Sequence, residues 1–304
     1  MKKIKIGIPR ALLYYRYGVL WKYFFKKLGL NVILSPETNQ TILDLGINNS
    51  IDESCLSSKI YLGHALYLSK TCDYILVSRV CDYGKKDKVC TRLNGLYDTL
   101  KCFVPESMII DYNIEYTSHA YHIIGFFKMG FRFTKNPLKI IYSYIYALKK
   151  QKAYNKTKYQ EEQNKLFKPQ KKILIFSQFY NIKDKFISSY IINYLESSNI
   201  IPIIPSHLSS KLALSFSDYF SDTLYWHYSK ELVGSLYYYS HQIDGIIYLS
   251  TYPCGLSALV NNLAISKYPN IPSINLLIDE NITNLSLETK LESFVDIING
   301  GSNE

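Results

Sequence analysis

The sequence has no apolar run near the roughly 18–20 residues that a membrane-spanning helix needs. Its start, Met1-Lys2-Lys3, carries the charge of a signal-peptide n-region. The alternating residues 4–10 that follow do not form the continuous apolar segment of a signal peptide. We therefore expect a cytoplasmic protein with no membrane association. Because disulfides are rare in that compartment, the six cysteines need another explanation.

Several short motifs are also absent. No C-x-x-C occurs, which excludes the zinc-ribbon, thioredoxin and ferredoxin patterns. The first predicted strand is not followed by G-x-G-x-x-G, and G-x-x-x-x-G-K-[ST] occurs nowhere, so neither common nucleotide site is expected. The isolated histidines are not assigned to a metal; these are His64, His207, His227 and His241.

The net charge of +10 is concentrated in residues 114–168, where eleven Lys and Arg stand against three Glu. Apolar spacing predicts helices over 121–133 and 138–165, broken at Asn136-Pro137. We prefer the interpretation of a helical insert with a solvated basic face. RNA, a membrane surface, a protein partner and an acidic ligand such as a CoA phosphate are alternatives for this face. A nucleic-acid surface over the whole protein is not expected.

The rest of the chain alternates predicted strands and helices, which is typical of a parallel α/β sheet. Strands are expected near 3–8, 31–34, 72–78 and 108–110, and again near 173–176, 200–204, 245–249 and 273–278. The prediction is two doubly wound, Rossmann- or flavodoxin-like parallel-sheet domains that face each other. Their expected bounds are 1–113 and 169–304, with the insert 114–168 between them.

The stretch around Cys254 organises the functional prediction. An apolar run over 245–249 predicts a buried strand, and 258–267 predicts a helix, so Cys254 lies in the turn between them. Ligands of open α/β sheets bind at this rim, where a helix N-terminus favours a thiolate.

Two further cysteines occupy similar places. Cys55 precedes a predicted helix over 56–68, with Asp52 or Ser54 as the expected N-cap. Cys90 lies in a basic loop that would lower the pKa of its thiol. Together, Cys55, Cys90 and Cys254 are the candidate metal ligands. Cys81, expected just after the third strand, is a possible addition. Spacing alone leaves a zinc site, or no metal, as alternatives.

The other cysteines are assigned to structure. Cys72 precedes the third strand at the opposite rim, and Cys102 opens the apolar pair Phe103-Val104. Both are interpreted as packed residues.

Segments from the first half of the chain resemble the acyl-CoA dehydratase activase-related proteins. These are relatives of the 2-hydroxyacyl-CoA dehydratase subunits and of the double-cubane-cluster reductases. The opening Ile8-Pro9-Arg10-Ala11-Leu12-Leu13-Tyr14-Tyr15-Arg16-Tyr17-Gly18 is similar to the opening of that family. Cys55-Leu56-Ser57-Ser58-Lys59 with Gly63-His64 resembles its Cys-Leu-Pro-x-Lys and Gly-His segment, with Ser57 in place of Pro.

The resemblance continues to the end of the chain. Cys90, followed by Gly95-Leu96-Tyr97-Asp98, resembles a Cys-Pro and Gly-Leu-Pro-Asp loop. Pro253-Cys254-Gly255 through Ser257 resembles a Cys-Gly-Pro-x-Ser turn that has lost its Pro. Leu277-Ile278-Asp279-Glu280 and the segment 288–294 resemble the ending Asp-Glu…Thr-Arg-Leu-Glu-x-Phe, with Lys290 in place of Arg.

The resemblance implies an iron-sulfur cluster, either [4Fe-4S] or double-cubane [8Fe-9S], held by three cysteines. It also implies a separate ATP-hydrolysing iron-sulfur activator that supplies a low-potential electron, and a homo- or heterodimer. In the dehydratases that electron reduces a CoA thioester to a ketyl radical. We therefore expect an iron-sulfur redox protein that acts on an acyl-CoA or another small substrate. The alternative is a non-catalytic electron carrier or scaffold for the activator. The lost prolines leave it open whether the chain catalyses a reaction, and no catalytic residue is assigned.

Overall fold

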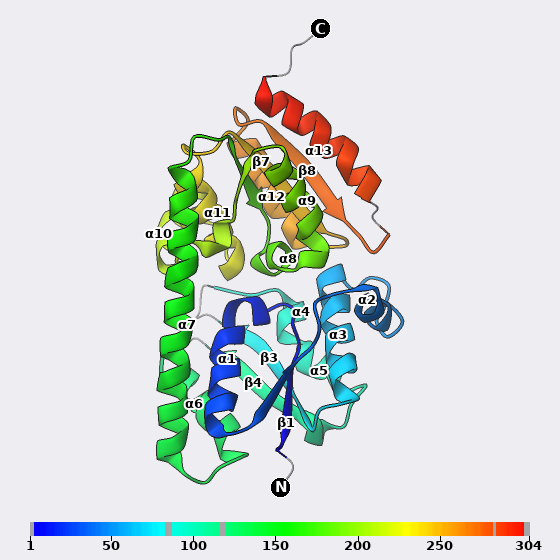
Figure 1. The fold of residues 1–304 in the computed structure, drawn as a ribbon, viewed down its shortest axis with the longest axis vertical. Coiled ribbons are helices and arrows are strands. Elements are labelled where there is room, and N and C mark those ends of the chain that lie inside the picture. Colours follow the sequence, from blue (N-terminus) through cyan, green and yellow to red (C-terminus); the bar gives the residue numbers. More distant parts are fainter. Residues whose placement is uncertain (1–2, 83–86, 116–118, 282–283, 301–304) are drawn as a thin grey trace. The chain divides into compact units, whose positions relative to one another are not determined.

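A computed structural model describes residues 3–82, 87–115, 119–281 and 284–300 (Figure 1). The chain divides into two compact units. Unit 1 contains residues 1–154 and also Tyr225–His227, and unit 2 contains residues 155–224 and 228–304. The division falls inside one long helix, α7 (Pro137–Leu166), within the segment expected to be an insert. The bounds 113 and 168 stay predictions.

Unit 1 is built around a four-stranded parallel sheet in the order β2-β1-β3-β4. The strands are β1 (Lys5–Ile8), β2 (Asn31–Leu34), β3 (Tyr74–Asp82) and β4 (Ile109–Glu115). The helices are α1 (Tyr14–Leu28), α2 (Gln40–Ile47), α3 (Leu56–Ser69), α4 (Thr91–Asn94), α5 (Leu96–Leu100) and α6 (His119–Phe131), with a 3-10 turn at Glu106–Met108.

Unit 2 has a second four-stranded parallel sheet, in the order β6-β5-β7-β8. Its strands are β5 (Lys172–Phe176), β6 (Ile201–Ile203), β7 (Gly245–Thr251) and β8 (Ser273–Ile278). Its helices are α8 (Phe179–Lys183), α9 (Lys185–Ser197), α10 (Ser210–Phe220), α11 (His227–Tyr239), α12 (Gly255–Lys267) and α13 (Asn284–Asn299), with a 3-10 turn at Pro205–His207. The two parallel sheets with helices between their strands confirm the predicted α/β fold.

Local signals in the sequence explain several of these helix ends. Gly29 ends α1 with a φ of 94°, a left-handed conformation that glycine adopts without strain. The side chain of Asn136 accepts hydrogen bonds from the backbone N–H groups of Leu138 and Lys139, so Asn136 caps the start of α7 beside Pro137. The predicted break between two helices at Asn136-Pro137 is therefore confirmed.

The two sheets have the same strand order. In each, the first residue of the first strand donates its backbone N–H to an aspartate that precedes the third strand. The N–H of Lys5 donates to the Asp73 carboxylate, and the N–H of Lys172 donates to that of Asp244, at 2.7 and 2.8 Å. The turn after the first long helix has a positive φ in both units, at Gly29 and at Asn199. The two units therefore share one topology and several local details.

The helix pair between the second and third strands repeats as well. A Cβ on Gly63 of α3 would lie 1.9 Å from the carbonyl oxygen of Ile42, and one on Gly234 of α11 would lie 1.9 Å from that of Ala213. The two glycines therefore mark equivalent helix crossings. When α3 and α11 are aligned on them, five residue types coincide: Ser58 with Ser229, Lys59 with Lys230, Gly63 with Gly234, Tyr67 with Tyr238, and Ser69 with Ser240.

Candidate functional site

The three predicted ligand cysteines share one structural position. Cys55, Cys90 and Cys254 are the N-cap residues of α3, α4 and α12, and none of their side chains caps its helix with a hydrogen bond. All three are partly exposed. A metal-bound cysteine carries the negative charge of a thiolate, and the backbone N–H groups at a helix start stabilise negative charge.

Cys55 itself, rather than Asp52 or Ser54, caps α3, so the predicted capping residues were wrong. The carbonyl of Cys55 accepts the first backbone hydrogen bonds of the helix, from Ser58 and Lys59. Its sulfur lies 3.2 Å from the hydroxyl oxygen of Ser58. A thiolate at Cys55 would accept a hydrogen bond from this hydroxyl, which would help to fix the sulfur in place.

Cys254 has the same surroundings in unit 2. It follows β7 and begins α12, as the sequence predicted. Its sulfur lies 3.1 Å from the hydroxyl oxygen of Ser257, again three residues further on. Cys55 and Cys254 therefore share one local feature, an N-cap cysteine with a serine in the first helical turn, although they occupy different places in their units.

Cys90 lies between the third and fourth strands of unit 1, and Cys254 lies between the third and fourth strands of unit 2. In each unit the sheet order changes direction beside the third strand, between β1 and β3 or between β5 and β7. Ligands of open parallel sheets bind at the carboxyl ends of the strands at such a switch point. Cys90 and Cys254 are therefore in equivalent positions, each next to a favoured ligand site.

The remaining cysteines differ from one another. Cys72 is buried, as predicted, and burial raises the pKa of its thiol. Cys102 is exposed, which corrects its assignment as a packed residue. Cys81 was expected after the third strand but lies within β3, because that strand continues to Asp82. Its side chain is outside the described residues, so Cys81 stays only a possible ligand.

Within the described residues, no group of three or more His, Cys, Asp or Glu side chains is arranged to hold a metal ion. Cys55 and Cys90 belong to unit 1, whereas Cys254 belongs to unit 2. The shared ligand set of Cys55, Cys90 and Cys254 therefore stays a prediction.

A polar cluster in unit 1 joins two segments that carry the family resemblance, the one around Arg10 and the one around His64. The Nε2 atom of His64, on α3, lies 2.9 Å from the Thr38 hydroxyl oxygen. The Arg10 backbone N–H donates to the Ser35 hydroxyl, and its guanidinium pairs with Glu37. Burial, together with the nearby charge of Arg10, lowers the pKa of His64 to about 3. No metal was assigned to His64 from the sequence, and nothing in its spacing places it near Arg10.

This burial predicts acid sensitivity. Because the pKa of His64 is lower in the folded protein than in the unfolded chain, its contribution to stability is complete above about pH 6.5 and is lost as the pH falls toward 3. Between pH 6 and 4.5, wild type should lose about 2 kcal/mol more of its unfolding free energy than His64→Gln. Urea unfolding at each pH measures this difference. The exposed His241→Gln should follow wild type; a His64→Gln curve parallel to wild type would contradict the prediction.

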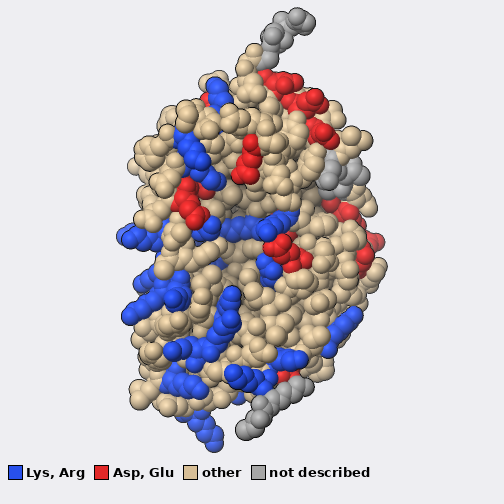
Figure 2. Space-filling model, in the orientation of Figure 1, with Lys and Arg blue, Asp and Glu red and all other residues tan. Residues whose placement is uncertain are grey.

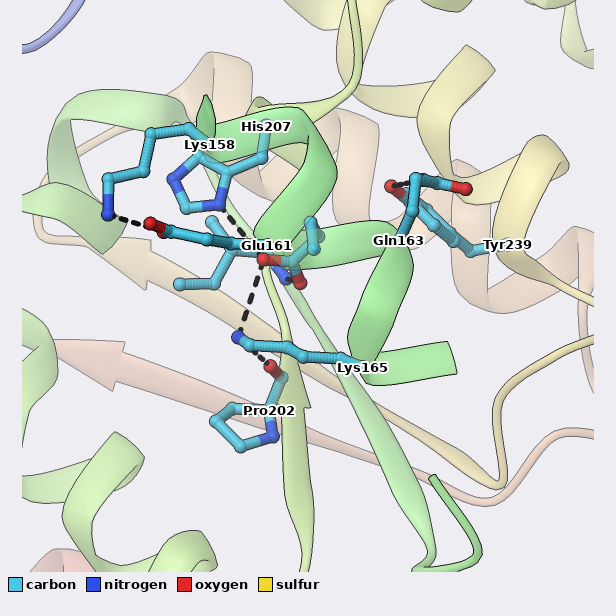
Figure 3. Close-up of polar contacts among 9 residues, drawn as sticks. Lys158, Glu161, Gln163, Lys165, Pro202, His207 and Tyr239 are labelled. Carbon is cyan, nitrogen blue, oxygen red and sulfur yellow. Dashed lines mark hydrogen bonds and ion pairs between the residues drawn. The ribbon is translucent and has the colours of Figure 1, made fainter. Parts of the chain in front are cut away.

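A buried carboxylate in unit 2 joins α7 to the loop after β6 (Figure 3). The side chain of Glu162 is 1% exposed and accepts hydrogen bonds from the backbone N–H of Ile204 at 2.6 Å and from His207 Nδ1 at 2.9 Å. Lys165 lies 3.3 Å from the same carboxylate and donates to the carbonyl of Pro202. Burial lowers the pKa of His207. Because both oxygens of Glu162 and the amine of Lys165 bind groups of the protein itself, we assign the cluster to anchoring α7.

The helix α7 carries most of the basic character predicted for this segment, and α6 contributes only Lys128. Figure 2 shows Lys and Arg side chains gathered on the side of the molecule along which α7 runs. The exposed lysines of α7 include Lys149, Lys152 and Lys156, while its opposite side buries Ile140 and Ala147. Across the described part of the chain, no helix is both long and apolar enough to cross a membrane.

Comparison with known proteins gives one family match. The model of the family described as "CoA enzyme activase uncharacterised domain" matches residues 5–208, which is more than half of the chain. Cys55 and Cys90 lie inside the matched region and Cys254 lies beyond it. A search of curated proteins finds no match.

Proposed function

Because this chain belongs to the CoA enzyme activase uncharacterised domain family, we propose that it is an iron-sulfur redox protein of a CoA-dependent enzyme system. In this proposal it accepts a low-potential electron from an ATP-hydrolysing activator protein and passes it to a CoA thioester or another small substrate. The observation that carries the proposal is the position shared by Cys55, Cys90 and Cys254, each the N-cap of a helix.

The chemistry of these residues fits an iron-sulfur cluster. Clusters are held by cysteine thiolates, and three thiolates on a cubane leave one iron open to a substrate oxygen or another ligand. The N-termini of α3 and α12 would stabilise two of the thiolates and offset part of the cluster's negative charge, and the basic residues next to Cys90 in the sequence would do the same for the third. Ser58 would donate a hydrogen bond to the ligating sulfur of Cys55, and such a bond tunes the potential at which a cluster accepts an electron; Ser257, which accepts from the Cys254 thiol in this structure, lies close to the second sulfur.

The activator is proposed as a separate protein because the chain carries neither of the two common nucleotide-binding motifs. The family description links the chain to enzyme activation, which supports a protein partner. We further propose that the working assembly is a homo- or heterodimer and that the protein is cytoplasmic.

Anaerobic purification tests the cluster. A single cubane requires about four irons and four sulfides per chain, and a brown protein with an EPR signal on reduction is expected. A double cubane would raise the iron to about eight. Cys55→Ser, Cys90→Ser and Cys254→Ser should each lose most of the iron, because only two thiolates would then remain to hold the cluster.

Two cysteines provide matched controls in the same chain. Cys72→Ser and Cys102→Ser change a buried and an exposed thiol outside the proposed ligand set, and both should keep the iron content of wild type. A colourless wild-type protein without iron or sulfide, prepared anaerobically with cluster-assembly proteins present, would refute the proposal. Iron lost equally from the control variants would refute the ligand assignment.

A non-catalytic electron carrier would hold the same cluster but would not bind acyl-CoA. A thermal shift of the cluster-loaded protein with acyl-CoA under anaerobic conditions separates the two functions. A ligand at 100 times its dissociation constant stabilises a folded protein by about 2.7 kcal/mol, which is readily measured. No shift at any concentration would favour the carrier.

A further inference from the structure

Three residues that are distant in sequence hold the segment before Cys90. The N–H of Lys88 donates to the carbonyl of Tyr225 at 2.7 Å, and the N–H of His227 donates to the carbonyl of Lys88 at 2.9 Å. These hydrogen bonds form a parallel bridge between Lys88 and Trp226. All of these residues belong to unit 1.

A side-chain contact reinforces this bridge. The Nδ1 atom of His227 lies 3.1 Å from a carboxylate oxygen of Asp87, and the His227 side chain is only 8% exposed. The hydrogen bond therefore lies mostly out of water and restrains the backbone three residues before Cys90. The rings of Tyr225 and Trp226 contact each other at a tilt of 34°, with centroids 4.1 Å apart. We call Tyr225–His227 the strap.

The strap lies at the start of α11, at the position that corresponds to Cys55 at the start of α3. Cys55 precedes Gly63 by eight residues, and Trp226 precedes Gly234 by eight residues, in helices that cross their neighbours in the same way. The position that carries a candidate ligand before α3 therefore carries the centre of the strap before α11. Trp226 provides no sulfur, but its backbone is paired with the segment that leads to Cys90.

From these contacts we infer that the strap is a positioning element for Cys90, with His227 as its positioning residue acting through Asp87. Its consequence for metal binding rests on the proposed function. Cys90 caps a helix of only four residues, so α4 alone gives the thiol little support. The strap adds a restraint on the backbone just before Cys90 and lowers the entropy that Cys90 loses on binding a metal.

Cysteine labelling tests the strap in protein without a cluster. Limited reaction with a maleimide, followed by digestion and mass spectrometry, gives the labelling rate of Cys90 relative to Cys102 in the same molecule. His227→Ala should raise this ratio about tenfold, because a hydrogen bond to a charged group contributes about 1.4 kcal/mol or more. Asp87→Ala should have the same effect, and the double variant should add little.

Two further variants separate positioning from general loss of structure. His227→Asn keeps an N–H group near the position of Nδ1 and should restore the wild-type ratio. His241→Ala removes an exposed histidine from the same chain and should leave the ratio unchanged. An unchanged ratio in both His227→Ala and Asp87→Ala would overturn the inference. A raised ratio that His227→Asn fails to restore would overturn the role of His227 as the positioning residue.

Iron retention gives a second readout. In protein loaded with iron and sulfide, His227→Ala should lose iron to a chelator about tenfold faster than wild type, as expected from the same hydrogen bond. If wild-type protein binds no iron, the proposed function fails while the labelling result still decides the strap. If wild type holds iron and His227→Ala holds it equally well, with unchanged labelling, the strap inference fails and the proposed function stands.

Discussion

Replacing Glu162 with alanine is expected to lower the free energy of unfolding of unit 2 by about 2–4 kcal/mol, because each buried hydrogen-bond donor left without an acceptor costs about 1–3 kcal/mol. The variant would leave the backbone N–H of Ile204 and the Nδ1–H of His207 without their acceptor in a buried site. Because whole domains are stable by only about 5–15 kcal/mol, this loss would be a large fraction of the total.

The neighbouring residue provides the control. Glu161 pairs with Lys158 on the exposed side of the same helix, so Glu161→Ala should unfold like wild type. Urea unfolding followed by far-ultraviolet circular dichroism measures both variants. Equal midpoints for Glu162→Ala and Glu161→Ala would show that the buried carboxylate does not anchor α7.

Adding one methyl group at Gly63 is expected to destabilise unit 1 by about 3 kcal/mol, at the upper end of the cost of overpacking a core. The added Cβ would lie 1.9 Å from the carbonyl oxygen of Ile42, and that oxygen belongs to the backbone of α2 and cannot rotate away. The helices α2 and α3 must therefore separate. Both tryptophans of the chain, Trp21 and Trp226, belong to unit 1, so tryptophan fluorescence during urea unfolding reports on it.

The equivalent glycine of unit 2 provides a second test, and two other glycines provide controls. Gly234→Ala should destabilise unit 2 by a similar amount, because the same 1.9 Å approach to a backbone oxygen occurs there. Gly95→Ala and Gly255→Ala should cost little, since an added Cβ meets only one atom at 3.5 Å or none within 4 Å. If Gly63→Ala were as stable as Gly95→Ala, the close helix crossing would be wrong.

The strands and most helices could be predicted from the sequence because their signals are local. Buried apolar runs marked β5 and β7, and Gly29 marked the end of α1. The helix α2 was missed, since its start depends on the side chain of Asn39 within a polar stretch. The length of β3 was underestimated because its last residues are held by pairing with β4, which includes an ion pair between Arg79 and Asp111.

The candidate site was only partly predictable. A cysteine between a predicted strand and a predicted helix is a local pattern, so the place of Cys254 could be inferred. The serines beside Cys55 and Cys254 could have been noticed, because both follow at the third position in the sequence. The strap, the Glu162 anchor and the contact of His64 with Thr38 join residues 26 to 140 positions apart, and no spacing rule relates them.

The close crossing of α2 and α3 at Gly63 also has a consequence for the residue at the start of α3. Gly63 sets how closely α3 packs against α2, and Cys55 lies about two turns earlier, at the start of α3. The crossing at Gly63, rather than Cys55 itself, therefore places the start of the helix. The corresponding position before α11, eight residues before Gly234, holds Trp226. A sulfur donor can therefore be added or removed at this position without a change in how the two helices cross.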